Sequence, residues 1–319
     1  MVLVGIGQGC ILCRKTLLRG SASSDAGVIT KPYCSSTAAI LPTSDSRQKD
    51  PERCANFLSG MADNRFEWSE AKQLSLFQIF LAFAIPSAIA FTGFRFVLPA
   101  VHAAGAPSIL AWPVIASVML LGFTVAPLWL MHREAKELEI SLKERMCLRP
   151  LNRKQWLVAS AILIVGLIVA GATGSLNGIW MGITGLSVPE YFPFFLNPAV
   201  DPMAMAPEAL TPGFQLKGAY WLIGLMIATL LLNILVEEIY FRAWLLPKMM
   251  TLGTVAWAVN GVAFALYHTF QLWLLPQLIP LSLFMAFVVY YTRSIWPALV
   301  FHLAVNSLSV GAIVYLIVS

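Results

Sequence analysis

The chain has 319 residues, of which 58% are hydrophobic and 12% are charged, and its formal net charge at pH 7 is +5. Soluble domains average about a quarter charged residues, so this composition excludes an ordinary soluble protein and indicates an integral membrane protein. The polar segments contain no basic patch interleaved with aromatic residues, and we therefore expect no nucleic-acid partner.

Residues 1–60 differ from the rest of the chain, because they are rich in Ser, Thr and Arg and have no sustained hydrophobic period. Such a segment fits a disordered tail or an organellar transit peptide. A third interpretation is an over-extended reading frame, since "MADNRFEW" at Met61 resembles an ordinary start. We expect one membrane-embedded domain over residues 61–319, with its sequence motifs in residues 215–319.

From residue 74 onward, apolar runs recur at about the 20-residue length that a helix needs to cross a bilayer. The sequence predicts an all-α, multi-pass bundle of about seven spans, at residues 74–94, 109–131, 156–183, 218–241, 254–274, 278–292 and 295–318. The same composition fits a bacterial inner membrane, the endoplasmic reticulum or an organelle membrane.

The loop at residues 132–155 is strongly basic, and basic loops favour the cytoplasmic side of a membrane. With this loop inside, only Arg95 and Lys217 fall outside among the basic residues from Arg65 onward. Part of the loop is an amphipathic helical segment, which we expect at the membrane interface or as a solvated connection. We expect the aromatic, Pro-rich outer loop at residues 184–217 to pack on the membrane surface and to carry no chemistry.

Few ionisable residues lie within the predicted spans, where such residues usually face a bundle interior, a partner or a water-filled cavity. These residues and one amide are Glu237, Glu238, Arg242, His268, His302 and Asn306. Glu238 and Arg242 are four residues apart and can pair on one helix face, as can His302 and Asn306. Glu237 lies about 100° around the helix and has no local counter-charge.

Together these side chains match a hydrolytic reaction. A carboxylate beside a histidine can act as a general base toward water. A second histidine and an amide can donate hydrogen bonds to the oxyanion that forms when water attacks a carbonyl. The GxSxG, HExxH and GxGD motifs of other intramembrane proteases are absent from the sequence. We predict peptide hydrolysis inside the membrane, on a lipid-modified or membrane-embedded substrate.

Three segments also carry a family resemblance: "EEIYFR" at residues 237–242, "FALYH" at 264–268 and "HLAVN" at 302–306. They resemble the EExxxR, FxxxH and HxxxN motifs of the CAAX protease and bacteriocin-processing (CPBP, or Abi) family. This family includes the type II CAAX prenyl endopeptidases, which are glutamic intramembrane proteases. The three motifs occur in the same order on successive apolar segments.

The resemblance implies a role for each motif residue. The implied catalytic residues are Glu237 as general base, His268 as its partner, and His302 and Asn306 as the oxyanion hole. The implied supporting residues are Glu238, Arg242 and Phe264. The family's eukaryotic members remove the last three residues of prenylated CAAX proteins, whereas many bacterial members have unknown substrates or act in bacteriocin immunity. Ala243 departs from the family pattern, in which many members have Gly after the Arg.

Two other functions fit the same residues. Glu237, His268 and His302 could hold a zinc ion with a bound water, which would make the chain a metalloprotease. We favour a reaction without a cofactor, in which membrane lipid and a prenylated or membrane-associated peptide are the partners. A non-enzymatic transporter or immunity factor could use the same cluster to bind a proton or a peptide. The sequence lacks the two similar halves of an inverted-repeat transporter.

Overall fold

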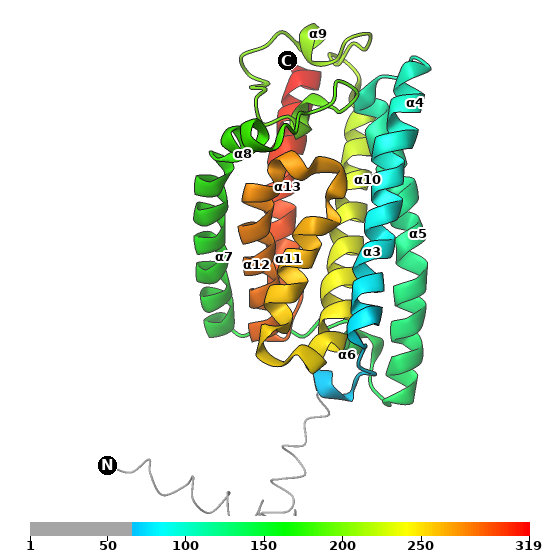
Figure 1. Cartoon of the computed structure of the whole chain (residues 1–319), viewed down its shortest axis with the longest axis vertical. Coiled ribbons are helices and arrows are strands. Elements are labelled where there is room, and N and C mark those ends of the chain that lie inside the picture. Colours follow the sequence, from blue (N-terminus) through cyan, green and yellow to red (C-terminus); the bar gives the residue numbers. More distant parts are fainter. Residues whose placement is uncertain (1–65) are drawn as a thin grey trace, which may run out of the picture. The chain divides into compact units, whose positions relative to one another are not determined.

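A computed structural model of the chain describes residues 66–319, so the predicted transit-like or disordered segment at residues 1–60 lies outside the described residues. Residues 66–319 contain helices, turns and loops and no β-strand. The helices line up as a bundle, with the loop between α8 (Asn177–Thr184) and α10 (Tyr220–Glu237) at one end and α6 (Leu142–Arg145) at the other (Figure 1). The predicted all-α class is confirmed.

The first half of the described chain contains eight helical elements of very different length. These are η1 (Trp68–Glu70), α3 (Leu76–Thr92), the π-helical η2 (Gly93–Val97), α4 (Leu98–Ala103), α5 (Ser108–Glu137), α6 (Leu142–Arg145), α7 (Arg153–Gly174) and α8 (Asn177–Thr184). The helices α3, η2 and α4 form one continuous stretch. Pro86 lies inside α3, and Pro113 and Pro127 lie inside α5. Membrane helices tolerate such prolines because neighbouring groups satisfy the freed backbone.

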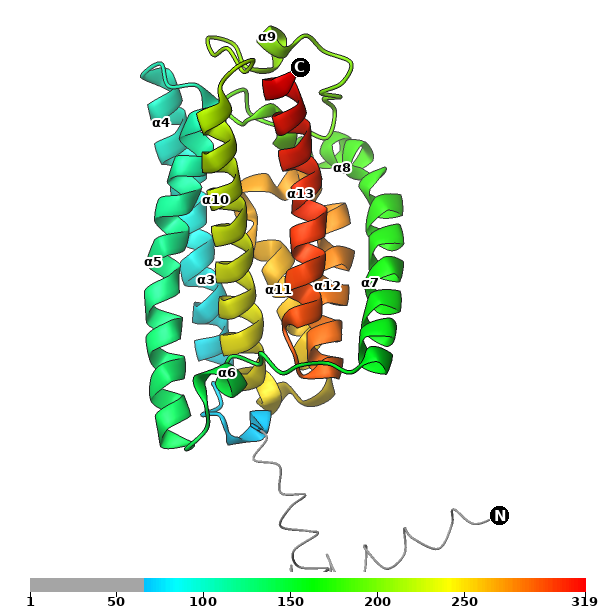
Figure 2. The same ribbon diagram turned by 180° about the vertical axis from the view of Figure 1, so that it is seen from behind.

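The second half carries the three motifs. Its elements are η3 (Phe194–Leu196), α9 (Pro207–Leu210), α10 (Tyr220–Glu237), the π-helical η4 (Glu238–Leu245), the 3-10 η5 (Leu246–Val255), α11 (Ala256–Tyr267), η6 (Thr269–Leu274), α12 (Leu275–Thr292) and α13 (Trp296–Val318). The helix α10 packs against α5 and α13, and α12 packs against α7 and α11 (Figure 2). The motif-bearing helices therefore lie within the bundle and are flanked by the others.

Six helical stretches in residues 66–319 are long and apolar enough to cross a membrane, where about seven spans were predicted. The difference arises in Tyr220–Tyr267, whose 48 residues count as one stretch. A straight helix of that length would measure roughly 72 Å, more than twice the bilayer core. The chain turns back instead at η5, where Gly253 has φ 61° and ψ −137°, so α10 and α11 run in opposite directions (Figure 1). The predicted fourth and fifth segments are both present but joined. The protein is a multi-pass integral membrane protein.

Close helix packing holds α11 against α12 at Gly261. A Cβ atom at Gly261 would lie 2.8 Å from the Cα atom of Leu283 and 3.0 Å from the carbonyl oxygen of Ser282. Small residues allow two helix backbones to approach in this way, and such contacts drive helix association in membranes. This contact fixes the position of α11, which carries the second motif.

A buried ion cluster lies at the end of the bundle that contains α6. Glu134, near the end of α5, forms ion pairs with Arg145, at 2.6 Å, and with Lys248 of η5. Arg145 is fully buried, and its Nη1 atom donates a hydrogen bond to the carbonyl oxygen of Ala243, at 2.8 Å. The segment 132–155 is not one continuous helix, because its first residues extend α5 to Glu137 and Leu142–Arg145 form the short helix α6. Most of residues 132–144 are exposed, whereas Arg145 packs against η4. Its location at the membrane interface stays a prediction.

Candidate active site

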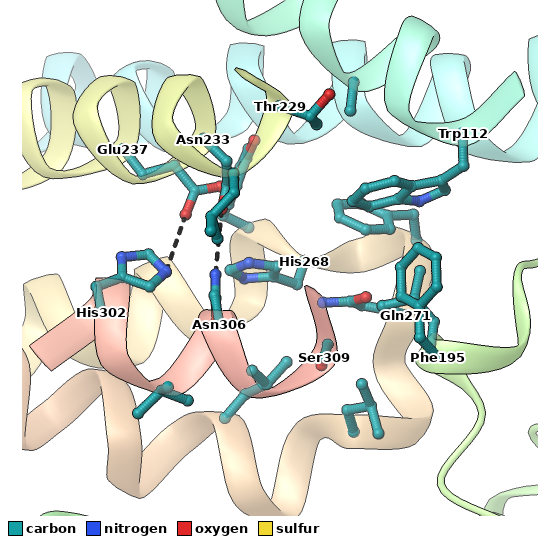
Figure 3. Close-up of a pocket in the computed structure, with 18 of the residues that line it drawn as sticks. Trp112, Phe195, Thr229, Asn233, Glu237, His268, Gln271, His302, Asn306 and Ser309 are labelled. Carbon is teal, nitrogen blue, oxygen red and sulfur yellow. Dashed lines mark hydrogen bonds and ion pairs between the residues drawn. The ribbon is translucent and has the colours of Figure 1, made fainter. Parts of the chain in front are cut away.

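A cavity of about 310 Å³ lies among α5, α10, α11, α12 and α13. The side chains of the four residues predicted to be catalytic all line it, although they come from three separate segments (Figure 3). They are Glu237 at the end of α10, His268 at the end of α11, and His302 and Asn306 on α13. Phe264, predicted to support the site, lines the same cavity.

The helices α10 and α13 face each other with two polar contacts across the cavity (Figure 3). The Nε2 atom of His302 lies 3.9 Å from the Oε2 atom of Glu237, and the Nδ2 atom of Asn306 donates a hydrogen bond to the Oδ1 atom of Asn233, at 3.3 Å. Each helix contributes its two residues at a spacing of four, so both lie on one face. Asn233 was not predicted, although it precedes Glu237 by four residues and the i, i+4 spacing could have revealed it.

Glu238 is fully buried and holds His302 in place. Its Oε1 atom lies 3.0 Å from the Nδ1 atom of His302 and 3.6 Å from the Nη1 atom of Arg242. A carboxylate accepts hydrogen bonds, so the Nδ1 atom of His302 carries the proton that it donates. This contact fixes the ring so that its other nitrogen faces Glu237. The predicted pair of Glu238 with Arg242 is present, and Glu238 also binds the ring of His302.

Arg242 is fully buried between Glu238 and the ring of Phe264. The guanidinium carbon lies 3.7 Å from the ring centroid, a close cation–π contact. Within the described residues, the three guanidinium nitrogens have no hydrogen-bond partner. The Phe264 ring also meets the His268 ring edge to face, at 5.0 Å between centroids. Phe264 therefore supports the charged pair on one side and His268 on the other.

His268 lies where α11 ends, with φ −76° and ψ 43° outside the helical region. Its Nδ1 atom lies 3.0 Å from the carbonyl oxygen of Phe264. A carbonyl oxygen only accepts hydrogen bonds, so Nδ1 carries the proton and Nε2 is the acceptor nitrogen. The resemblance implied that His268 is the partner of Glu237. In the structure the Oε2 atom of Glu237 lies 3.9 Å from the Nε2 atom of His302, while His268 lines the same cavity.

The segment after Glu237 is a π-helix, Glu238–Leu245, a rare conformation that is frequent at functional sites. The main-chain carbonyl of Ala243 in this segment accepts the hydrogen bond from Arg145. The carbonyl of Phe241 accepts a hydrogen bond from the Nδ2 atom of Asn260 on α11, at 2.9 Å. Buried side chains thus satisfy backbone groups that a regular α-helix would pair internally.

The family model described as type II CAAX prenyl endopeptidase Rce1-like matches residues 219–308. The predicted family resemblance is confirmed. The Rce1-like segment begins just before α10 and ends within α13, so it contains all three motifs. Neither a curated protein nor a solved structure matches the chain. The match supports a peptidase of the CAAX-type intramembrane class.

The cavity extends beyond the Rce1-like segment toward an aromatic end. Trp112 of α5 and Phe195 of η3 lie there (Figure 3), and their rings meet edge to face at 5.5 Å between centroids. Leu196 lines the cavity too, and its carbonyl oxygen accepts a hydrogen bond from the Nε1 atom of Trp273, at 2.9 Å. Two residues of the outer loop, Phe195 and Leu196, therefore form part of the cavity wall. That the loop packs on the membrane surface stays a prediction.

The zinc hypothesis requires Glu237, His268 and His302 to converge on one ion. Among residues 66–319, no group of three or more His, Cys, Asp or Glu side chains is placed to hold a metal ion. That the reaction needs no cofactor stays a prediction.

Proposed function

We propose that the protein is an intramembrane endopeptidase that hydrolyses a peptide bond in a prenylated or otherwise membrane-bound substrate. The observation that carries this proposal is the position of Glu237. Its carboxylate is only 4% exposed, lines a cavity between membrane-spanning helices and lies 3.9 Å from His302. A buried ionisable residue of this kind in a membrane protein is usually functional.

In the proposed reaction, Glu237 acts as the general base. It takes a proton from a water molecule in the cavity as the water oxygen bonds to the substrate carbonyl carbon. His268 assists through its acceptor nitrogen, Nε2. When the carbon–nitrogen bond breaks, the proton passes to the leaving amine. The products are one new carboxylate and one new amino group, so no further reactant is needed.

The oxyanion of the tetrahedral intermediate requires hydrogen-bond donors, which we assign to His302 and Asn306. The Nδ2 atom of Asn306 has two hydrogens and uses one for Asn233. The other is available to the substrate. His302 can donate from its Nε2 atom once it holds a second proton, and Glu238 stabilises that cationic form through the contact at Nδ1. Both donors lie one helical turn apart on α13 and can reach the same oxygen.

The lining of the cavity supports a substrate with apolar groups. Outside the polar residues, its walls consist of apolar and aromatic side chains such as Phe94, Leu120, Met226 and Leu278. Ligand sites of this composition hold apolar groups and orient them with a few polar contacts. A C-terminal peptide next to a prenyl group fits this combination, and the Rce1-like segment supports the same substrate class.

The test compares matched prenylated and unprenylated peptides with the purified full chain in lipid nanodiscs. We expect cleavage of the prenylated peptide only. Glu237→Gln should lower the rate about 100-fold or more, because it removes the general base while preserving size. Glu137→Gln is the matched control, since that side chain is 65% exposed and distant in sequence from the motifs, and its rate should stay unchanged.

Several results would contradict the proposal. Cleavage of both peptides would remove the prenyl requirement, and cleavage of neither would favour a non-enzymatic role. Full activity of Glu237→Gln would exclude Glu237 as the base. Loss of activity in a chelator, restored by zinc, would favour the metalloprotease alternative.

A further inference from the structure

Gln271 is a buried amide in the cavity that the proposed reaction does not use. It lies in η6, is 8% exposed and lines the cavity between His268 and Phe195 (Figure 3). Its main-chain N–H donates a hydrogen bond to the carbonyl of His268, at 2.9 Å, so a tight turn links the two residues. Its backbone, with φ −136° and ψ 46°, departs from helical values inside η6.

The side-chain oxygen of Gln271 lacks a donor. Its Oε1 atom is buried and has no hydrogen-bond partner within residues 66–319. Buried side-chain acceptors in native proteins are nearly always paired, and an exception needs an explanation. The other carboxamides in the cavity do have partners. Asn306 donates to Asn233, and Gln277 accepts from Asn177 at 3.0 Å. The buried side-chain oxygens of Asn177 and Asn260 also lack a partner within residues 66–319, but neither residue lines the cavity. Among the carboxamides that line the cavity, Gln271 is therefore the one with a buried, unpaired oxygen.

The missing partner must be a hydrogen-bond donor. A prenyl chain has no donor, and a terminal carboxylate only accepts hydrogen bonds. A peptide main chain supplies an N–H group at each residue. The neighbouring aromatic residues Trp112 and Phe195 can cover apolar side chains of the same peptide. The chemistry at this position thus matches a short apolar peptide more closely than a lipid tail.

Gln271 lines the same cavity as the proposed reaction centre. In Figure 3 it lies close to Ser309, and His268 and Asn306 lie between it and His302 in this view. Three residues of extended peptide span roughly 10 Å. A leaving segment of three residues would therefore extend along the cavity from the scissile bond toward Gln271.

We propose that Gln271 binds the main chain of the leaving tripeptide. Its Oε1 atom accepts a hydrogen bond from the N–H group of the second or third residue after the scissile bond. This inference rests on the proposed peptidase function and adds a substrate-positioning residue to it. Gln271 acts on binding of the peptide and takes no part in proton transfer.

The test replaces single amide bonds of the prenylated peptide with esters, which removes one N–H group and keeps the shape. In the wild-type protein, an ester at the second or third residue after the scissile bond should raise KM about tenfold, the effect of one lost buried hydrogen bond. The value of kcat should change less than twofold. In Gln271→Met, the all-amide peptide should already show the higher KM, and the ester should add nothing, because the two changes remove the same contact.

Two controls define the outcome. An ester two residues before the prenylated cysteine should leave KM unchanged. Gln277→Met, which alters an amide that already has a protein partner, should keep the wild-type response to the esters. An ester effect of equal size in wild type and Gln271→Met would overturn the inference.

The wild-type protein alone provides a second test if Gln271→Met does not fold. No ester effect at either position, or an equal effect at the control position, would overturn the inference while leaving the peptidase function intact. Absence of any cleavage by the wild-type protein would overturn the peptidase function, and this inference with it.

Discussion

Glu238 holds His302 through a contact of 3.0 Å between its Oε1 atom and the Nδ1 atom of the ring. Its neighbour Glu237 lies on the other side of the same ring, 3.9 Å from Nε2. Successive residues on a helix point about 100° apart, so the two carboxylates cannot occupy the same position. One is fully buried and orients the imidazole, while the other faces the cavity. This division explains why two adjacent carboxylates occur within an apolar span.

The first prediction concerns the buried pair of Glu238 and Arg242. Glu238→Gln should lower the free energy of unfolding by about 3–5 kcal/mol, because it leaves a buried guanidinium without its counter-charge. The double variant Glu238→Gln/Arg242→Met should recover part of this loss, since both charges are then absent. Denaturant unfolding in detergent measures both variants. A double variant less stable than Glu238→Gln alone would contradict the role of the pair.

The second prediction concerns Phe264, whose ring covers the guanidinium of Arg242 at 3.7 Å. Phe264→Leu should destabilise the protein by about 2 kcal/mol more than a Phe→Leu change at a site without a cation–π contact, because a desolvated cation–π contact is lost. Phe287→Leu is the control, since Phe287 meets the ring of Trp257 edge to face, at 5.0 Å, and stacks on Tyr291, without a cation–π contact among the described residues. Thermal unfolding of the two variants gives the comparison. Equal losses would show that the cation–π contact contributes nothing.

The sequence was sufficient to predict the convergence of the site, for a physical reason. Ionisable residues inside a membrane must find partners or water, so Glu237, His268 and His302 had few alternatives to a shared cavity. The break between the predicted spans at residues 218–241 and 254–274 was also visible in the sequence, and the chain turns back there at Gly253. The lower number of spans arises because the helical assignment runs through this turn without a gap, from Tyr220 to Tyr267.

The aromatic end of the cavity could not be predicted from local patterns. It depends on contacts between distant segments, such as the hydrogen bond from Trp273 to the carbonyl of Leu196. Gln271 likewise has no distinctive spacing, because it lies in a 3-10 segment where the α-helical period no longer applies. Asn233 is different, since its spacing from Glu237 was visible in the sequence. Local rules thus identify residues on regular helices and miss those on irregular turns.

The third prediction concerns helix packing at Gly261. Gly261→Ala should destabilise the protein by about 1–3 kcal/mol, because the new Cβ atom would lie 2.8 Å from the Cα atom of Leu283 and the backbone must move. The shift of α11 should also lower peptide cleavage, since this helix carries Phe264 and His268. Gly224→Ala is the control, because a Cβ atom there meets nothing within 4 Å among the described residues. Equal stability and activity of the two variants would contradict this prediction.

The last prediction concerns the ion cluster behind the π-helical segment. Arg145→Met should lower the free energy of unfolding by about 3–5 kcal/mol, because it removes the buried partner of Glu134 and the donor to the carbonyl of Ala243. Ala243 directly follows Arg242, so cleavage of the prenylated peptide should fall as well.

Arg133→Met provides the matched control for that change. Arg133 also pairs with a glutamate, Glu137, but the two side chains are 57% and 65% exposed. Exposed pairs contribute about 0–1 kcal/mol, so this variant should unfold and cleave like the wild type. The comparison separates burial from charge, because both variants lose one arginine from an ion pair. If both variants behaved alike, Arg145 would be an ordinary surface charge, and the site would have to be held in place by the helix packing at Gly261 and by the contacts within the cavity.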